Sequence, residues 1–175
     1  MARKVIDEPF LLIESDLVFD PSLLADMLYP DRIAVARMQP WLNGSTVTID
    51  PSNRVDAFHT SPKGKTRDRY KTVNIYSLSL AAWHRVIQEL DRYILAGRVN
   101  DYYEAVFRKM VAEEKLSFKA IFFDHKPWYE IDTMADLASA EIMFPSKLRD
   151  TFPLFDMPTD PFEKTALRGS VHARS

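Results

Sequence analysis

The sequence predicts an α/β protein with a mixed central sheet. Short apolar, β-branched runs alternate with segments of helical periodicity, and turn residues separate the two kinds of segment. The composition is that of a globular chain: of 175 residues, 46% are hydrophobic and 27% are charged, with a net charge of −2. A chain of this length usually forms one compact domain with a sizeable core.

Strands and one short helix are expected in the first third of the chain. Residues 9–16, PFLLIESD, form an apolar run bounded by proline and by acids, as in a central strand. Asp20 can cap a short helix over residues 20–29, because Pro21 suits the first helical position. Further strands are expected over residues 32–37, 45–50 and 53–58, and the last two form a hairpin around the turn DPSN.

The middle of the chain predicts a strand followed by two helices. A polar, basic loop over residues 59–70 precedes the β-branched strand 71–79. Residues 80–97 predict a helix that ends at Gly97, and residues 100–114 predict a second helix with an Asn or Asp cap. In the first of these helices the apolar residues that recur at helical spacing are Trp83, Val86, Ile87, Leu90 and Ile94.

The last expected elements are a strand over residues 117–123 and a helix over residues 134–143. Thr133 precedes that helix as its cap, and Asp136 stands three residues later, as in a capping box. From about Pro145 the sequence becomes rich in proline and then polar, without a period. We therefore expect a domain over residues 1–145 and a tail or linker over residues 146–175.

The composition excludes several classes of function. The absence of cysteine excludes disulfides and thiolate metal sites and fits a cytoplasmic enzyme. No apolar run reaches the length that spans a membrane, and no basic excess points to nucleic acid. The four glycines include no G-x-G pair, so the sequence carries no glycine-rich nucleotide-binding loop.

Acidic residues stand at two positions that suit a metal site. Asp16 follows the first predicted strand, where ligands gather in open α/β sheets, and carboxylates there can hold Mg²⁺. Glu130 and Asp132 occupy alternate positions, which face one side of an extended segment, so a nearby cation would offset their repulsion. The alternative is that one acid caps the following helix, but Thr133 already supplies that cap.

Aromatic and basic residues lie near these acids in the sequence. Trp41, Tyr102 and Tyr103 stand in polar settings, and aromatic faces with carboxylates can hold ammonium groups. Core packing is the alternative for most of the aromatics, and Trp41, in a turn, is the best candidate for a cation cage. Lys71 opens a predicted strand and can meet a phosphate as a fixed charge, whereas we expect the basic loop before it to be solvated.

Five segments, in order, resemble the sugar-phosphate-type nucleotidyltransferases over roughly residues 5–144. The closest branch is the cytidylyltransferases that act on phosphocholine or 2-aminoethylphosphonate. The resemblance is carried by PFLLIESDLVFDPSLL, PWLNGSTVTID, YKTVNIYSLS, NDYYEAVF and WYEIDTMADLASAE.

This resemblance implies a Rossmann-like fold and a reaction in which a phosphate or phosphonate oxygen attacks the α-phosphorus of CTP and releases pyrophosphate. It implies that Asp16 and Asp132 bind Mg²⁺ and that Lys71 lies near the substrate phosphate. It further implies an ammonium site made of Glu130, Trp41 and a tyrosine of the YYE segment, Tyr102 or Tyr103. Such chemistry depends on positioning and charge neutralisation.

The family begins with a glycine-rich loop that this sequence does not contain, so we expect the chain to match an N-terminally truncated form of the fold. Two alternatives follow. One is a catalytically inactive fragment or a binding or regulatory module, for which a second copy of the chain is a candidate partner. The other is a sugar-phosphate nucleotidyltransferase with a different nucleotide, against which the aromatic and acidic segments argue.

Overall fold

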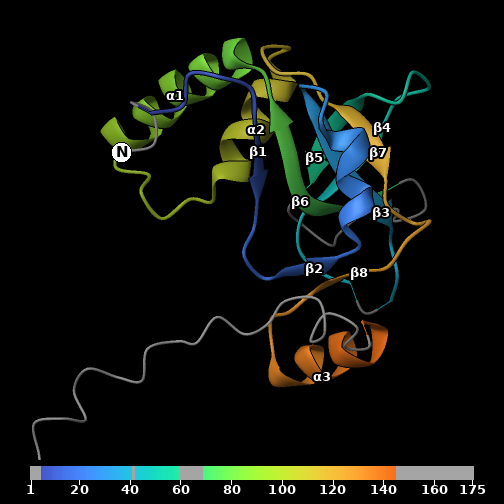
Figure 1. Cartoon of the computed structure of the whole chain (residues 1–175). Helices are drawn as coiled ribbons and strands as arrows, with labels where there is room; N and C mark the ends of the chain where they lie inside the picture. Colours follow the sequence, from blue (N-terminus) through green and yellow to red (C-terminus); the bar gives the residue numbers. More distant parts are fainter. Residues whose placement is uncertain (1–4, 41, 60–68, 145–175) are drawn as a thin grey trace, which may run out of the picture.

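The computed structural model describes residues 5–40, 42–59 and 69–144 (Figure 1). It contains the mixed sheet and the helices that the sequence predicts. The strands of the main sheet are β1 (Phe10–Ile13), β3 (Arg32–Arg37), β4 (Thr46–Ile49), β5 (Val55–His59), β6 (Tyr70–Leu78) and β7 (Lys119–Phe122). A two-stranded sheet is made of β2 (Leu17–Phe19) and β8 (Trp128–Glu130), and the helices are η2 (Pro21–Met27), α1 (Leu80–Leu95), α2 (Tyr103–Ala112) and α3 (Met134–Met143).

The long strand β6 forms the centre of the main sheet, whose order is β5-β4-β6-β3-β7, with β1 also paired to β6. Both β1 and β3 run antiparallel to β6, and β3 runs parallel to β7. The strands β1, β3 and β7 therefore point in one direction, so their carboxyl ends meet at one edge of the sheet. This edge leads into the small sheet of β2 and β8.

Each face of the sheet has its own apolar core. Helices α1 and α2 cover one face, where Tyr76 and Phe107 pack edge to face with centroids 5.1 Å apart. The 3-10 helix η2 covers the other face with Leu23 and Met27, next to Ile75 and Phe123. The register between β3 and β6 shifts near Ile33 and Val35, which places an irregularity in β6 between its residues 72 and 76.

The predicted caps of η2 and α3 are confirmed. The Asp20 side chain accepts a hydrogen bond from the Ser22 backbone N–H at 2.9 Å. Thr133 and Asp136 form the full capping box at the start of α3. In the part of the chain that the structure describes, no helix is both long and apolar enough to cross a bilayer.

Two details of the helix predictions were wrong. The predicted apolar face of α1 included Ile94, which is 59% exposed, whereas Glu89 and Tyr93 are buried. Glu89 can be buried because Arg92 and Lys109 both donate to its carboxylate. Helix α2 begins after Tyr102 and not after an Asn or Asp cap, because Asp101 pairs with Arg98 instead. The expected tail over residues 146–175 lies outside the described residues.

Candidate functional site

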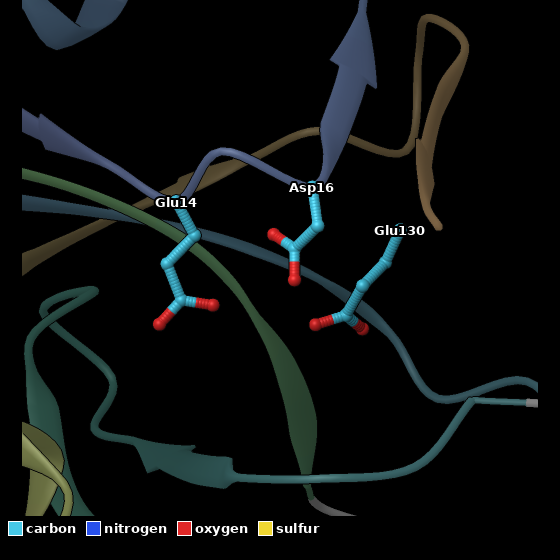
Figure 2. A group of neighbouring side chains, drawn as sticks. All are labelled: Glu14, Asp16 and Glu130. Carbon is cyan, nitrogen blue, oxygen red and sulfur yellow. The ribbon is translucent and has the colours of Figure 1, made fainter. Parts of the chain in front are cut away.

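Three carboxylates converge where β1 ends and β8 ends. One oxygen each of Glu14, Asp16 and Glu130 lies within 4.8 Å of the others, and Figure 2 shows the three side chains side by side, with their carboxylates directed into the same space. Glu14 and Asp16 follow β1, at the carboxyl edge of the sheet. Glu130 reaches them because β8 pairs with β2, which places Leu17 opposite Glu130, and because the Ile131 N–H donates to the Asp16 carbonyl at 2.8 Å.

The Asp16 carboxylate has an unused acceptor. Its Oδ1 atom is buried and has no hydrogen-bond partner in the described structure. Burying such an oxygen without a partner is unfavourable, and a hard cation with oxygen ligands would satisfy it. The residues therefore fit a Mg²⁺ ion. Asp132 lines the same cleft but does not belong to the group of three converging acids.

Lys71 is the buried cation of this site. Its side chain is 2% exposed, and its ammonium lies 3.1 Å from Glu130 Oε2 and 3.4 Å from Oε1. Gly44 makes room for it: a Cβ atom at residue 44 would lie 3.2 Å from Lys71 Nζ, and Gly44 has a φ of +85°. Both properties favour glycine there. The NG turn that holds Gly44 is thus part of the wall around the lysine.

Glu130 stands in a mixed electrostatic environment. Burial raises the pKa of this carboxyl, the charge and hydrogen bond of Lys71 oppose the rise, and the negative charges of Asp132 and Asp16 add to it. One lysine therefore does not neutralise this group of acids. An added cation would stabilise the ionised form of Glu130.

Asn74 is a site residue that the sequence reading missed. It lies in β6 with a φ of +58°, and its side-chain amide donates to Glu14 Oε2 at 2.8 Å and to Glu130 Oε1 at 3.1 Å. The Thr72 hydroxyl donates to the Asn74 side-chain oxygen at 2.9 Å, which fixes the orientation of the amide. The sequence signal that could have revealed this residue is an asparagine inside a β-branched strand. Asn tolerates the left-handed conformation that an irregular strand requires, so it can mark such an irregularity.

The irregularity in β6 explains how Lys71 and Asn74 reach the same carboxylate. Residues an odd number of positions apart face opposite sides of a regular strand. In β6 the pairing with β3 shifts between residues 72 and 76, so Lys71 and Asn74 are not held to opposite faces. Both side chains contact Glu130 Oε1.

The two tyrosines of the YYE segment take different positions. Tyr102 is 81% exposed and lines the rim of the cleft. Tyr103 is half-buried, and its hydroxyl donates to Glu14 Oε1 at 2.7 Å. Burial and the hydrogen bond to Glu14 raise the pKa of Tyr103, so it stays a neutral donor. Of the two tyrosines predicted for the ammonium site, Tyr102 therefore lies at the cleft, whereas Tyr103 orients the carboxylate of Glu14.

These residues surround a cleft of about 670 Å³. Acids outnumber bases among its lining residues, and Arg98 and Arg108, which the sequence reading did not single out, add positive charge at one side. Of the predicted site residues, the cleft brings together Asp16, Lys71, Tyr102, Glu130 and Asp132. Trp41 lies outside the described residues.

A second cleft, of about 560 Å³, adjoins the first. It shares Asn43, Glu130 and Asp132 with the first cleft, and its aromatic wall includes Trp128 and Tyr129. The segment from Glu130 to Asp132 therefore borders both spaces. Two reactants could approach these acids from the two clefts.

A sequence relative and solved structures are similar to this chain. No protein-family model matches the chain. A curated relative, the CMP-5'-(3-aminopropyl)phosphonate synthase of Streptomyces rubellomurinus, is 28% identical over 155 residues, which cover 82% of this chain and 24% of the relative. The chain thus spans about a quarter of the length of that relative.

Solved structures share the fold. The inositol-1-phosphate CTP transferase from T. maritima has a TM-score of 0.56 at 19% identity, and the match covers 85% of this chain and 59% of the other. The CTP:phosphocholine cytidylyltransferase of Streptococcus pneumoniae has a TM-score of 0.66 at 13% identity, over 77% of this chain and 57% of the other. The chain therefore shares the fold of these nucleotidyltransferases.

Proposed function

We propose that the chain contributes two sites of a Mg²⁺-dependent cytidylyltransferase: the site of the substrate that accepts the CMP group, and the site of the metal. Its substrate would be a small phosphonate or phosphate that carries an ammonium group, such as an aminoalkylphosphonate or phosphocholine. The observation that carries the proposal is the cleft itself, in which three acids converge and one of them, Glu130, forms an ion pair with the buried Lys71. The name of the curated relative, which contains an aminopropylphosphonate, supports this substrate class.

The reaction would form one bond and break one bond. An oxygen of the phosphonate attacks the α-phosphorus of CTP, the bond from that phosphorus to the bridging oxygen breaks, and pyrophosphate leaves. Bound Mg²⁺ would neutralise charge on the phosphates. Asp16, whose buried Oδ1 has no partner, would hold it with its neighbour Glu14, and Asp132, which lines the same cleft, is the further ligand that the resemblance implies. The remaining task of the protein is to position the two reactants.

Different residues of the cleft would position the two ends of the substrate, the phosphonate and the ammonium group. The Lys71 ammonium, fixed by Glu130 and by the wall at Gly44, offers a positive charge to the phosphonate oxygens. The excess of acid near Glu130 favours the substrate ammonium, and Tyr102 offers a ring at the rim. Asn74 and Tyr103 hold the acids in place through hydrogen bonds.

The test is pyrophosphate release with CTP, Mg²⁺ and 2-aminoethylphosphonate. Ethylphosphonate, which lacks the ammonium, serves as the matched control substrate. We expect release with the first substrate, loss of release in EDTA, and a strong preference over the control. Equal release from both substrates would contradict the ammonium site, and no release from a folded sample would contradict catalysis by this chain alone.

An open strand edge favours a second candidate function, that of a binding module. Among the described strands, β1 pairs only with β6, and Ile13 at its end is 38% exposed. An edge of this kind can accept a strand from another chain. Light scattering separates the two functions: a stable dimer or complex without turnover favours the module, and a monomer with turnover contradicts it.

A further inference from the structure

A basic cleft lies at the amino ends of the parallel strands, away from the acid-lined cleft. It has a volume of about 360 Å³, and its charged lining residues are Asp31, Arg32, Arg54, Arg85 and Lys119. Arg32 opens β3 and Lys119 opens β7, whereas Glu14 and Asp16 follow the end of β1. Because β1, β3 and β7 run in one direction, the two clefts lie at opposite ends of the strands.

Three of the cations occupy neighbouring positions across the sheet. Lys119 is paired with Arg32 on one side and with Arg54 on the other. Like charges directly opposite one another destabilise a sheet. Arg85, from α1, adds a fourth positive charge to the same cleft. An anion in the cleft would offset this repulsion, which at exposed side chains is otherwise reduced by solvent and salt.

The described residues offset only part of this positive charge, since Asp50 interacts electrostatically with Arg54 and Asp31 lines the cleft. Asp31 is the one acid that lines the described cleft, and its carboxylate accepts the Ser79 backbone N–H at 2.9 Å. Within the described part of the chain, neither Arg85 nor Lys119 forms an ion pair through its side chain. The excess of positive charge contrasts with the net charge of −2 of the whole chain.

Arg32 and Arg54 are held in place without losing their charge. The Arg32 guanidinium stacks over the Tyr29 ring, 4.4 Å from its centroid, and donates to the Asp26 carbonyl at 2.5 Å. Arg54 Nη1 donates to the Ser117 hydroxyl at 2.9 Å. A guanidinium fixed in this way retains further N–H donors, and its fork geometry matches phosphate oxygens.

We propose that this cleft binds a small soluble anion that carries two phosphate groups, for which inorganic pyrophosphate is the simplest probe. A diphosphate can meet several cations that converge from separate elements, whereas one monovalent anion leaves most of them unneutralised. The proposal is independent of the acid-lined cleft and of the activity proposed for it, because none of its residues lines that cleft.

The experiment is a titration of the full ¹⁵N-labelled chain with pyrophosphate in EDTA at constant ionic strength. We expect saturable shifts of the backbone amides of Asp31, Arg32, Ser117 and Lys119. Arg85→Ala and Lys119→Ala should each weaken binding roughly tenfold, as expected when a charged hydrogen bond is lost. Lys126→Ala, which removes a cation from another cleft, should leave the affinity unchanged.

Three results would overturn the proposal. Shifts that do not saturate and are spread over exposed lysines and arginines would show a diffuse ion atmosphere. Loss of binding in Lys71→Met, with binding retained in Arg85→Ala and Lys119→Ala, would place pyrophosphate in the acid-lined cleft. Binding to phosphatidylserine vesicles without any saturable response to pyrophosphate would identify a membrane-surface contact in place of a soluble ligand.

Discussion

Glu89 and Glu130 each contact a lysine, yet their surroundings shift their pKa values in opposite directions. Lys109 and Arg92 both donate to Glu89, and these hydrogen bonds lower the pKa of a side chain that is 2% exposed. At Glu130, burial raises the pKa, and Lys71 offsets only part of the rise because Asp132 and Asp16 lie nearby. The same pair of residue types thus gives two different electrostatic results.

The difference separates a structural ion pair from a site prepared for a ligand. Glu89 has two cations and links α1 to α2, so its charge is already satisfied. Glu130 shares one cation with a group of acids, so the folded protein leaves negative charge that a metal or a substrate ammonium can meet. Changes at the two glutamates and at their lysines should therefore act on different properties.

The largest expected effect is on turnover, when the lysine of the site is replaced. Lys71→Met should lower kcat roughly 100- to 1,000-fold, as is typical when an electrostatic contact to a developing charge is lost. Lys109→Met should leave kcat unchanged, because Lys109 lies at the α1–α2 contact. Steady-state kinetics on samples with a verified fold would check this, and similar kcat losses in both variants would remove the distinction between the two lysines.

The next largest effect on activity is expected when the Asn74 side chain, whose amide donates to both Glu14 and Glu130, is removed. Asn74→Gly keeps a residue that accepts a positive φ and removes the side chain with its hydrogen bonds, so the variant should still fold but with a lower stability. Activity should fall roughly 10- to 100-fold, as is usual when a group that orients ligands is removed.

Asn53→Gly is the matched control for this change. Asn53 also has a positive φ, of 61°, but it lies in the turn between β4 and β5, away from the acids. The activity of the Asn53→Gly variant should equal that of the unchanged protein in the same assay. An active Asn74→Gly variant would show that the acids hold their positions without the amide.

A smaller effect, on stability, is expected at Glu89. Glu89→Gln should lower the free energy of unfolding by about 1.5–3 kcal/mol, the range for hydrogen bonds to charged groups. The pKa of Glu89 is lowered from its ordinary value of 4.5, so its contribution is present above that pH and is lost as the pH falls through the folded-state pKa. Urea unfolding at pH 7 and at pH 3 would check both statements, and an equal loss at both pH values would contradict them.

The smallest effect has the opposite sign and is expected at Glu130. A raised carboxyl pKa means that the folded state favours the protonated form, so stability increases as the pH falls through the folded-state pKa. Glu130→Gln imitates that neutral form and should not lower the unfolding free energy at pH 7 in EDTA. A clear destabilisation would show that the ion pair with Lys71 outweighs burial and the neighbouring acids.

Local signals predicted most of the fold. The β-branched run of β6, the capping box at Thr133 and the proline after Asp20 depend on residues close in sequence. The structure contains the strand, the capping box and the helix start that they predict. The small sheet of β2 and β8 was missed because each strand has only three residues and is defined by its partner. The burial of Glu89 was missed because its second cation comes from another helix.

The candidate site was predictable where a residue type and a strand end coincide. Asp16, Asp132 and Glu130 follow or end strands, and Lys71 lies within one, so their placement in one cleft follows from the order of the elements. Asn74 was not predictable, because its role depends on an irregularity in the pairing of β3 with β6. The basic cleft was not predictable, because its cations come from four separate segments and only the loop before β6 concentrates basic residues in the sequence.

The irregular register of β6 also limits how this site can be transferred to another scaffold. A designer who copied Lys71, Asn74, Glu14 and Glu130 onto ideal strands would turn Lys71 and Asn74 to opposite faces of the sheet. The blueprint would have to include the displaced pairing with β3 and a residue that accepts a left-handed backbone. For this protein, the transferable unit is a backbone shape together with four side chains.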